Sequence, residues 1–191
     1  MSLIVAVVGM CGAGKSIVSD LLVSREFQYL RFGQITLDEV RRRGLAVNEE
    51  NERAVREGFR HQHGMGAYAT VNIPRFDELL KKGDVVGDGL YSWSEYKVLK
   101  ERYSDRLVVL SVYSSPKTRY ERLDARRLEQ EDAAARNRRI PPGQAKARDY
   151  AEIENIEKGG PIAMADYLIK NEGTKEDLEL EVERFLKWLG R

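Results

Sequence analysis

The sequence of 191 residues predicts an α/β fold, in which a parallel sheet lies between layers of helices. Short apolar runs along the whole chain predict the strands. Segments with helical spacing separate these runs, and strands that alternate with helices pair in parallel through right-handed crossovers. The five runs are LIVAVV at 3–8, QYLRF at 28–32, DVVGDG at 84–89, RLVVLSVYS at 106–114 and DYLIKN at 166–171.

The first predicted strand is nearly continuous in β-branched residues, which is typical of a strand covered on both faces. A glycine-rich octet follows it, and the next segment, SIVSDLLVS, predicts a helix. Ile17, Val18, Leu21 and Leu22 fall on one face of that helix at helical spacing.

Later helices have predicted N-termini. Thr36 and Glu39 form a candidate capping box in the segment after the second strand. The dipeptide 115–116, Ser-Pro, predicts the N-cap and first turn of the helix after the fourth strand. Thr174 and Asp177 predict a capping pair at the start of the last helix.

The composition is that of an ordinary soluble globular protein, with 42% apolar and 33% charged residues. A net charge of +1 makes nucleic acid or an anionic membrane an unlikely general partner. One cysteine excludes an internal disulfide and a four-thiolate zinc site. No apolar run approaches the ~18 residues needed to cross a bilayer, and residues 1–8 lack the basic start of a signal peptide. We expect a cytoplasmic protein. The sequence does not indicate its oligomeric state.

Residues 9–16 read GMCGAGKS and match the Walker A pattern, G-x-x-x-x-G-K-[ST], between a strand and an amphipathic helix. The glycines let backbone N–H groups surround a phosphate, and the helix N-terminus adds positive charge. Lys15 can reach the β- and γ-phosphates, and the Ser16 hydroxyl can bind Mg²⁺. The alternative is a glycine-rich turn. The residues predicted to bind nucleotide here are Gly9, Gly12, Ala13, Gly14, Lys15, Ser16 and Ile17.

Asp88 ends the third predicted strand, where P-loop proteins place an aspartate that holds Mg²⁺ through water. The alternative is a turn aspartate beside Gly89. The residue after Asp88 is glycine, whereas a motor-type ATPase needs a glutamate to activate water. Residues 171–174, NEGT, do not supply the N-K-x-D stretch of a GTPase. Both observations favour transfer of phosphate to a small acceptor over hydrolysis.

Two connections, 33–83 and 126–152, are too long for simple crossovers, and such insertions at strand ends usually carry function. The first is rich in arginine on a predicted helix, and guanidinium groups suit an anionic acceptor. The alternative is a solvated helix face. The candidate acceptor-binding residues of this insertion are Arg41, Arg53, Arg56 and Arg60.

The second connection has the composition of a flap that closes over both substrates and excludes water. Its arginines would neutralise the phosphoryl group in transfer. The alternatives are a charged surface hairpin and a nucleic-acid site, the latter weakened by interleaved acidic residues. The candidate arginines are Arg126, with a catalytic role, and Arg136 and Arg148, which would contact substrate.

The octet, the Asp88-Gly89 strand end, the arginine-rich flap and DYLIKNEGT together resemble the P-loop small-molecule kinases. This group includes nucleoside monophosphate kinases and dephospho-coenzyme A kinase, and the likeness is closest to the adenylate kinase-related proteins. The resemblance implies a three-layer P-loop NTPase fold with strand order 2-3-1-4-5. It further implies that Arg122 or Arg126 lies at the base of the lid, near the adenine or the phosphates, and that residues 171–174, which include Asn171 and Gly173, border the nucleotide base.

On this resemblance the chain is one domain, with a core (1–32, 84–125 and 153–191), an acceptor-binding insertion (33–83) and a lid (126–152). We expect an enzyme that uses ATP and Mg²⁺ to phosphorylate a nucleoside monophosphate or related metabolite. Lys15, Asp88 and Arg126 would be catalytic, and Ser16 and Asp88 would hold the metal. The competing interpretations are an ATP-binding switch that acts on a protein partner, and a kinase of nucleic-acid ends. The sequence does not distinguish ATP from GTP as the phosphate donor.

Overall fold

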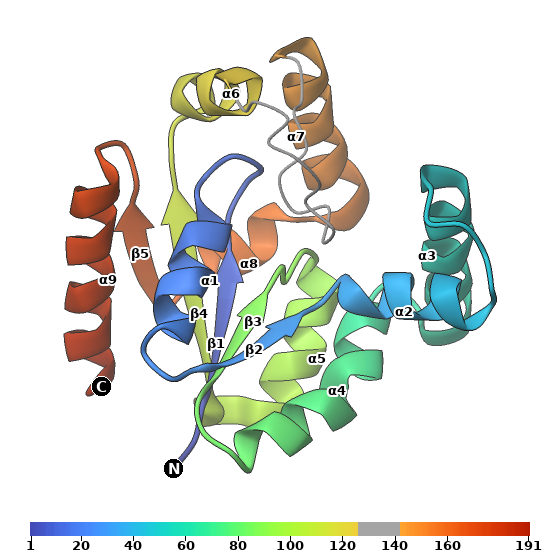
Figure 1. The fold of residues 1–191 in the computed structure, drawn as a ribbon, viewed down its shortest axis with the longest axis horizontal. Coiled ribbons are helices and arrows are strands. Elements are labelled where there is room, and N and C mark those ends of the chain that lie inside the picture. Colours follow the sequence, from blue (N-terminus) through green and yellow to red (C-terminus); the bar gives the residue numbers. More distant parts are fainter. Residues whose placement is uncertain (126–141) are drawn as a thin grey trace.

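The described residues form one parallel sheet of five strands in the order β2-β3-β1-β4-β5 (Figure 1). The computed structural model describes residues 1–125 and 142–191. The strand order and the parallel pairing confirm the predicted fold, and each strand lies inside one of the predicted apolar runs. The strands are β1 Ile4–Val8, β2 Gln28–Arg31, β3 Val85–Asp88, β4 Leu107–Tyr113 and β5 Tyr167–Lys170.

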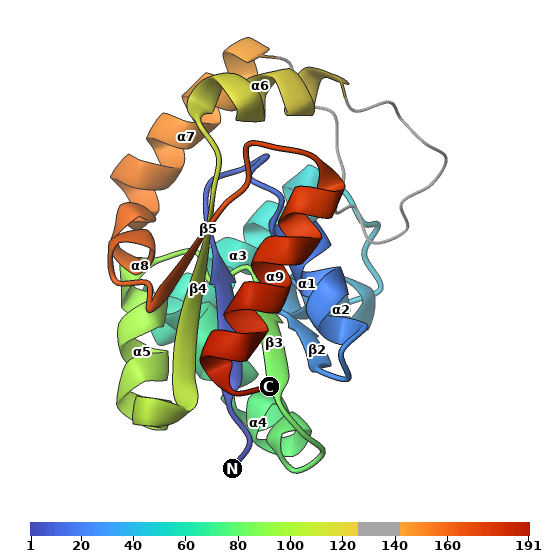
Figure 2. The ribbon, with the colours of Figure 1, turned by 90° about the vertical axis from the view of Figure 1, so that its left-hand side faces the viewer.

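Helices cover both faces of the sheet. In the described ranges they are α1 Lys15–Val23, α2 Gln34–Arg42, α3 Glu49–His63, α4 Ala67–Leu80, α5 Trp93–Tyr103, α6 Pro116–Ala125, α7 Pro142–Ile156, α8 Gly159–Ala163 and α9 Lys175–Leu189. Ile4, Ala6 and Val8 of β1 pack with side chains of α4 and α5, whereas Val5 and Val7 pack with α1 and α9. Figure 2 shows these layers with the sheet nearly edge-on.

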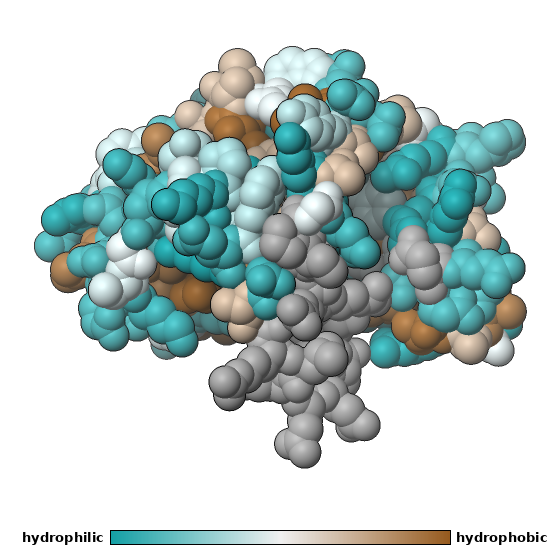
Figure 3. Space-filling model, turned by 90° about the horizontal axis from the view of Figure 1, so that it is seen from above, coloured by the Kyte–Doolittle hydropathy of each residue, from teal (hydrophilic) through white to brown (hydrophobic). Residues whose placement is uncertain are grey.

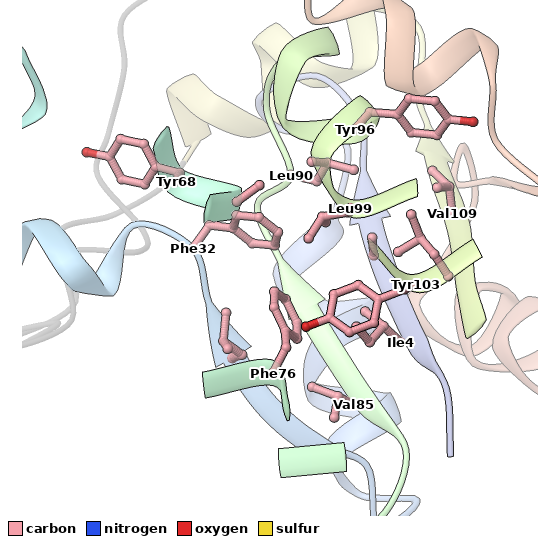
Figure 4. Close-up of a cluster of buried hydrophobic side chains, with 14 of the residues drawn as sticks. Ile4, Phe32, Tyr68, Phe76, Val85, Leu90, Tyr96, Leu99, Tyr103 and Val109 are labelled. Carbon is pink, nitrogen blue, oxygen red and sulfur yellow. The ribbon is translucent and has the colours of Figure 1, made fainter. Parts of the chain in front are cut away.

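An aromatic cluster fills the core beneath α4 and α5 (Figure 4). The ring of Phe76 packs edge-on against Phe32, with 5.6 Å between centroids, and against Tyr103, with 6.1 Å between centroids. A Cβ on Gly87 of β3 would lie 3.1 Å from the Phe76 ring and 3.2 Å from the Phe32 ring. Glycine at this position therefore lets both rings close onto the strand.

Two of the three predicted helix starts are confirmed. The Thr174 hydroxyl accepts a bond from the Asp177 N–H, and the Asp177 carboxylate accepts one in return, so a capping box opens α9. α6 begins at Pro116, and the Ser115 hydroxyl accepts a 3.4 Å bond from the Thr118 N–H. Both capping side chains satisfy backbone donors that have no partner inside the helix.

The capping box predicted for Thr36 and Glu39 is wrong. α2 begins two residues earlier, at Gln34, so that Thr36 lies inside the helix and is buried. Its hydroxyl is hydrogen-bonded to that of Tyr68, and Glu39 pairs with arginines one turn further along α2. The tertiary contact with α4 therefore decides the position of Thr36, which the local pattern could not indicate.

The carboxyl ends of the strands meet at one edge of the sheet, and the long connections leave from that edge. In the pairing register, Asp88 of β3 lies opposite Val7 of β1 on one side and Arg31 of β2 on the other. α2 and α3 project outward from this edge, and α6 and α7 lie above it (Figure 1). None of the helices in the described part of the chain has the length and apolarity needed to span a bilayer.

Candidate functional site

The octet at 9–16 forms a tight loop between β1 and α1, as predicted. Gly9, Gly12 and Gly14 have φ angles of 139°, 82° and 101°, a region that favours glycine. A Cβ on Gly14 would lie 2.3 Å from the side-chain nitrogen of Asn171, so no larger residue fits there without displacing it. We call residues 9–16 the phosphate loop.

Asn171, directly after β5, holds the phosphate loop from behind, and Arg122 of α6 holds the turn that carries Asn171. The Asn171 side-chain nitrogen donates to the Ala13 carbonyl at 2.9 Å, and Asn171 is 5% exposed. Arg122 donates to the Asn171 carbonyl at 3.0 Å and to the Gly173 carbonyl at 3.4 Å. Arg122, Asn171 and Gly173 thus lie together, as a support for the loop and the turn after β5.

A cavity of about 520 Å³ opens in front of the phosphate loop, bounded by α2, α3, α7 and the strand ends. Figure 3 shows this end of the molecule, where hydrophilic side chains predominate. The cavity lining is strongly charged. Its cationic side chains are Lys15, Arg31, Arg56, Arg60, Arg148 and Lys158, and its acidic side chains are Glu52, Asp88, Glu95 and Glu152.

Lys15 lies inside the cavity and its Nζ donates to the Met10 carbonyl at 3.1 Å. Burial, followed by the charge of Lys158, lowers the pKa of Lys15 to about 8. Ser16 and Asp88 line the same cavity, and Asp88 accepts a 2.9 Å hydrogen bond from the Tyr29 hydroxyl. The cavity thus brings together the predicted phosphate-binding lysine and both predicted metal ligands.

The hydroxyl of Ser16 and the carboxylate of Asp88 are hard oxygen donors of the kind that Mg²⁺ prefers. Among the described residues there is no cluster of three or more His, Cys, Asp or Glu side chains suited to hold a metal. Two protein ligands fit Mg²⁺, which commonly completes its shell with phosphate oxygens and water. They would not make a structural site.

Comparison with known proteins places the chain in a family. A family model described as an AAA domain matches residues 5–158. The UPF0200 protein TK1334 of Thermococcus kodakarensis is 31% identical over 186 residues, which are 96% of this chain and 96% of that protein. The chain carries an AAA domain and belongs to the UPF0200 family.

Two solved structures resemble the UPF0200 fold seen here. The shikimate kinase of Bacteroides thetaiotaomicron has a TM-score of 0.59 at 12% identity and covers 99% of both chains. A gluconokinase of Sinorhizobium meliloti 1021 has a TM-score of 0.52 at 14% identity, covering 98% of this chain and 95% of that one. At such low identity these likenesses show the fold, which is that of the P-loop kinases.

The candidate acceptor arginines separate into two groups. Arg56 and Arg60 of α3 and Arg148 of α7 line the cavity. Arg53 pairs with Glu57 on the exposed side of α3. Arg41 and Arg53 are not part of the cavity lining. The predicted nucleotide-binding residues outside the lining are Gly9, Ala13, Ile17, Arg122, Asn171 and Gly173. The candidates Arg126 and Arg136 lie outside the described residues.

Several cavity residues have no counterpart in the sequence-based prediction. Arg31 could have been found, because it ends β2 next to Asp88 at the same edge of the sheet. Glu95 is the capping-box residue of α5 and accepts bonds from the backbone N–H groups of Tyr91 and Ser92. It is 4% exposed, and burial raises the pKa of its carboxyl to about 7. Lys158 follows α7 and gave no motif signal.

A buried ion pair joins α6 to α7 behind the phosphate loop. The Arg119 guanidinium donates to both oxygens of Asp149, at 2.9 and 2.6 Å, and the Tyr120 hydroxyl donates to the same carboxylate. Arg119 also donates to the Cys11 carbonyl at 3.1 Å. The UPF0200 chain therefore couples the position of α7, which carries Arg148, to the phosphate loop.

Proposed function

We propose that this UPF0200 protein is a small-molecule kinase that moves the γ-phosphoryl group of ATP to an anionic acceptor, a nucleoside monophosphate or related metabolite. One observation supports it most: a single cavity has the phosphate loop on one wall and Arg56 and Arg60 on the other. The two walls come from the proposed core and from the proposed acceptor-binding insertion, residues 33–83.

The donor half would be built from the phosphate loop. Backbone N–H groups and Lys15 would bind the β- and γ-phosphates, and Ser16 and Asp88 would hold Mg²⁺. When bound, the ion would neutralise part of the phosphate charge. Arg148 would act from α7, as part of a proposed lid at 126–152. Arg126 and Arg136 of that lid remain predictions.

The acceptor half would bind an anion through the guanidinium groups of Arg31, Arg56 and Arg60, whose planar forks suit phosphate oxygens. An oxygen of the acceptor phosphate would form a bond to the γ-phosphorus, while the bond from that phosphorus to the β–γ bridging oxygen breaks. ADP leaves with the bonding electron pair. The phosphate oxygen of a nucleoside monophosphate is already anionic, so no proton has to be removed from it; a hydroxyl acceptor, as in dephospho-coenzyme A, would have to give its proton to a base.

The solved structures support the class of reaction, since both are named as kinases of small molecules. The finer assignment, to the adenylate kinase-related or dephospho-coenzyme A kinase-like group, depends on the sequence resemblance. It is tested by incubating the protein with Mg·ATP and, separately, nucleoside monophosphates, dephospho-coenzyme A, shikimate and gluconate. ADP that forms only with one acceptor, with its phosphorylated product, is the expected result. ADP without acceptor, or none, contradicts the proposal and favours a switch.

Arg56→Ala is expected to raise the KM for the acceptor by about tenfold to a hundredfold, because it removes one charge-assisted contact to an anion. The KM for ATP should change less than twofold, roughly, since Arg56 lies on the acceptor wall. Arg53→Ala is the matched control: it lies on the same helix, outside the cavity lining, and pairs with Glu57. Equal effects of the two substitutions on the acceptor KM would contradict the assignment.

Binding of Mg·ATP is expected to weaken above pH 8. The free protein holds Lys15 with a pKa of about 8, so below this pH the lysine is already charged and binding takes up no proton. Above pH 8 the lysine of the free protein is mostly neutral and must take up a proton when the phosphates bind. The Kd for Mg·ATP therefore rises by about tenfold per pH unit. Isothermal titration calorimetry from pH 7 to pH 10 measures this. Lys15→Arg, which stays protonated, should show a flat profile, and a flat wild-type profile would contradict the prediction.

A further inference from the structure

We propose that Lys158 is a second phosphate-binding cation, which contacts the γ-phosphoryl group as it passes from donor to acceptor. This inference rests on the proposed function and adds a catalytic residue to it. Lys158 lies between α7 and α8 and lines the cavity that holds Lys15.

The burial of Lys158 is unusual for a lysine. It is 2% exposed, whereas lysine is almost never fully buried unless it is paired. Its ammonium pairs with the Glu152 carboxylate and lies 4.7 Å from the centroid of the Tyr91 ring. Both partners line the cavity themselves, so the ammonium is held at the cavity wall and not in the apolar core.

The backbone around Lys158 fixes this position. Glu157 has a φ of 53°, in the left-handed region that non-glycine residues rarely adopt, and the Lys158 N–H bonds to the Glu152 carbonyl at 3.2 Å. The following helix is seated tightly, because a Cβ on Gly160 would lie 2.8 Å from the Trp93 ring. Such strained backbone is commonly retained where a side chain must be held in one orientation.

Lys158 shares the cavity lining with Lys15 of the phosphate loop and with Arg60 of α3. It is the cation that most lowers the pKa of Lys15, on the phosphate-loop side. Burial raises the pKa of Glu95, and the positive charges of Arg60 and Lys158 partly oppose this rise. Because Lys15 and Arg60 line one cavity, a phosphoryl group that moves between them stays within the space that Lys158 also lines.

The balance of charge there favours a polyanion. Lys158 and Arg148 share one carboxylate, that of Glu152, and Arg148 donates to it at 2.9 Å. Lys15 lines the same cavity and adds a third cation to its wall. Cations packed together repel one another unless a strongly anionic group lies among them, and the transferred phosphoryl group provides such a charge. A purely structural ion pair between α7 and α8 would need no access to the cavity.

The test compares nucleotides that differ in the γ-phosphate. Binding of ADP and of the β,γ-imido analogue of ATP, each with Mg²⁺, is measured by isothermal titration calorimetry on wild type, Lys158→Met and Glu152→Gln. Lys158→Met should lower the affinity for the triphosphate by about tenfold to a hundredfold and the affinity for ADP by less than about twofold. Glu152→Gln should raise the affinity for the triphosphate, because it removes the carboxylate that competes with phosphate for Lys158. Lys97→Met, an exposed lysine of α5, is the matched control.

The opposite signs separate binding from structure. If Lys158 and Glu152 form only a structural pair, both substitutions change affinity in the same direction and affect ADP and the triphosphate equally, which overturns the inference. Circular dichroism melting checks that each variant is folded, and Lys158→Arg, which keeps the charge, should retain the preference for the triphosphate if Lys158→Met does not fold. Failure of wild type to bind either nucleotide would overturn the proposed function itself.

Discussion

Lys15→Ala is expected to lower the rate of ADP formation on the order of 10²–10³-fold, the usual effect of removing one preorganised donor from the developing charge. The fold should survive, because Lys15 lies in the cavity and bonds to a carbonyl of its own loop. Coupled-enzyme detection of ADP with the acceptor found in the panel measures the rate.

The control for this substitution is Lys97→Ala, at an exposed position on α5. It should leave the rate and the affinity for Mg·ATP within about twofold of wild type. Equilibrium dialysis with the Lys15→Ala protein shows whether the loss lies in binding or in turnover. A variant that keeps wild-type turnover would show that the phosphate loop does not carry the reaction.

Asp149→Ala is expected to destabilise the protein by about 3–5 kcal/mol, because it leaves the Arg119 guanidinium buried without its carboxylate. The two side chains are 5% and 10% exposed, so water cannot replace the lost partner. For a chain of this size the melting temperature should fall by roughly 6–20 °C. Differential scanning calorimetry measures it. Nucleotide affinity should fall as well, since Arg119 holds the Cys11 carbonyl of the phosphate loop.

Two variants bracket this result. Glu78→Ala breaks an ion pair whose side chains are 69% and 67% exposed, and its effect should stay below about 1 kcal/mol. The double variant Arg119→Met with Asp149→Leu removes both buried charges and should recover much of the stability lost in Asp149→Ala. If Asp149→Ala melted like wild type, the buried pair would have no role in joining α6 to α7.

The fold could be predicted because its signals are local. A run such as that of β4, apolar at nearly every position, indicates a strand covered on both faces, and Thr174 with Asp177 indicates a helix start within four residues. The Walker A spacing is local too, so the phosphate loop was predicted with its neighbours. Thr36 shows the limit of this reasoning, because its hydroxyl bonds to Tyr68, 32 positions away, and α2 starts before it.

The charged wall of the cavity depends on contacts that sequence spacing does not encode. Arg53, Arg56 and Arg60 lie on one helix, yet only the packing of α3 against α2 and α4 decides that the last two line the cavity. Lys158 stands outside every motif, and its burial follows from the turn at Glu157 and from Glu152. Interpretation of the flap from its arginines alone thus missed Lys158, a buried cation of the cavity wall.

The central place of β1 in the sheet affects how the protein is made. Its neighbours are β3, beginning at Val85, and β4, beginning at Leu107, so a growing chain presents β1 long before either edge can be paired. Folds dominated by such distant pairings form slowly and expose strand edges on the way. The phosphate loop after β1 also needs Asn171, near the end of the chain, whose side chain donates to the Ala13 carbonyl. The complete phosphate loop therefore depends on the last strand of the sheet as well as on the first.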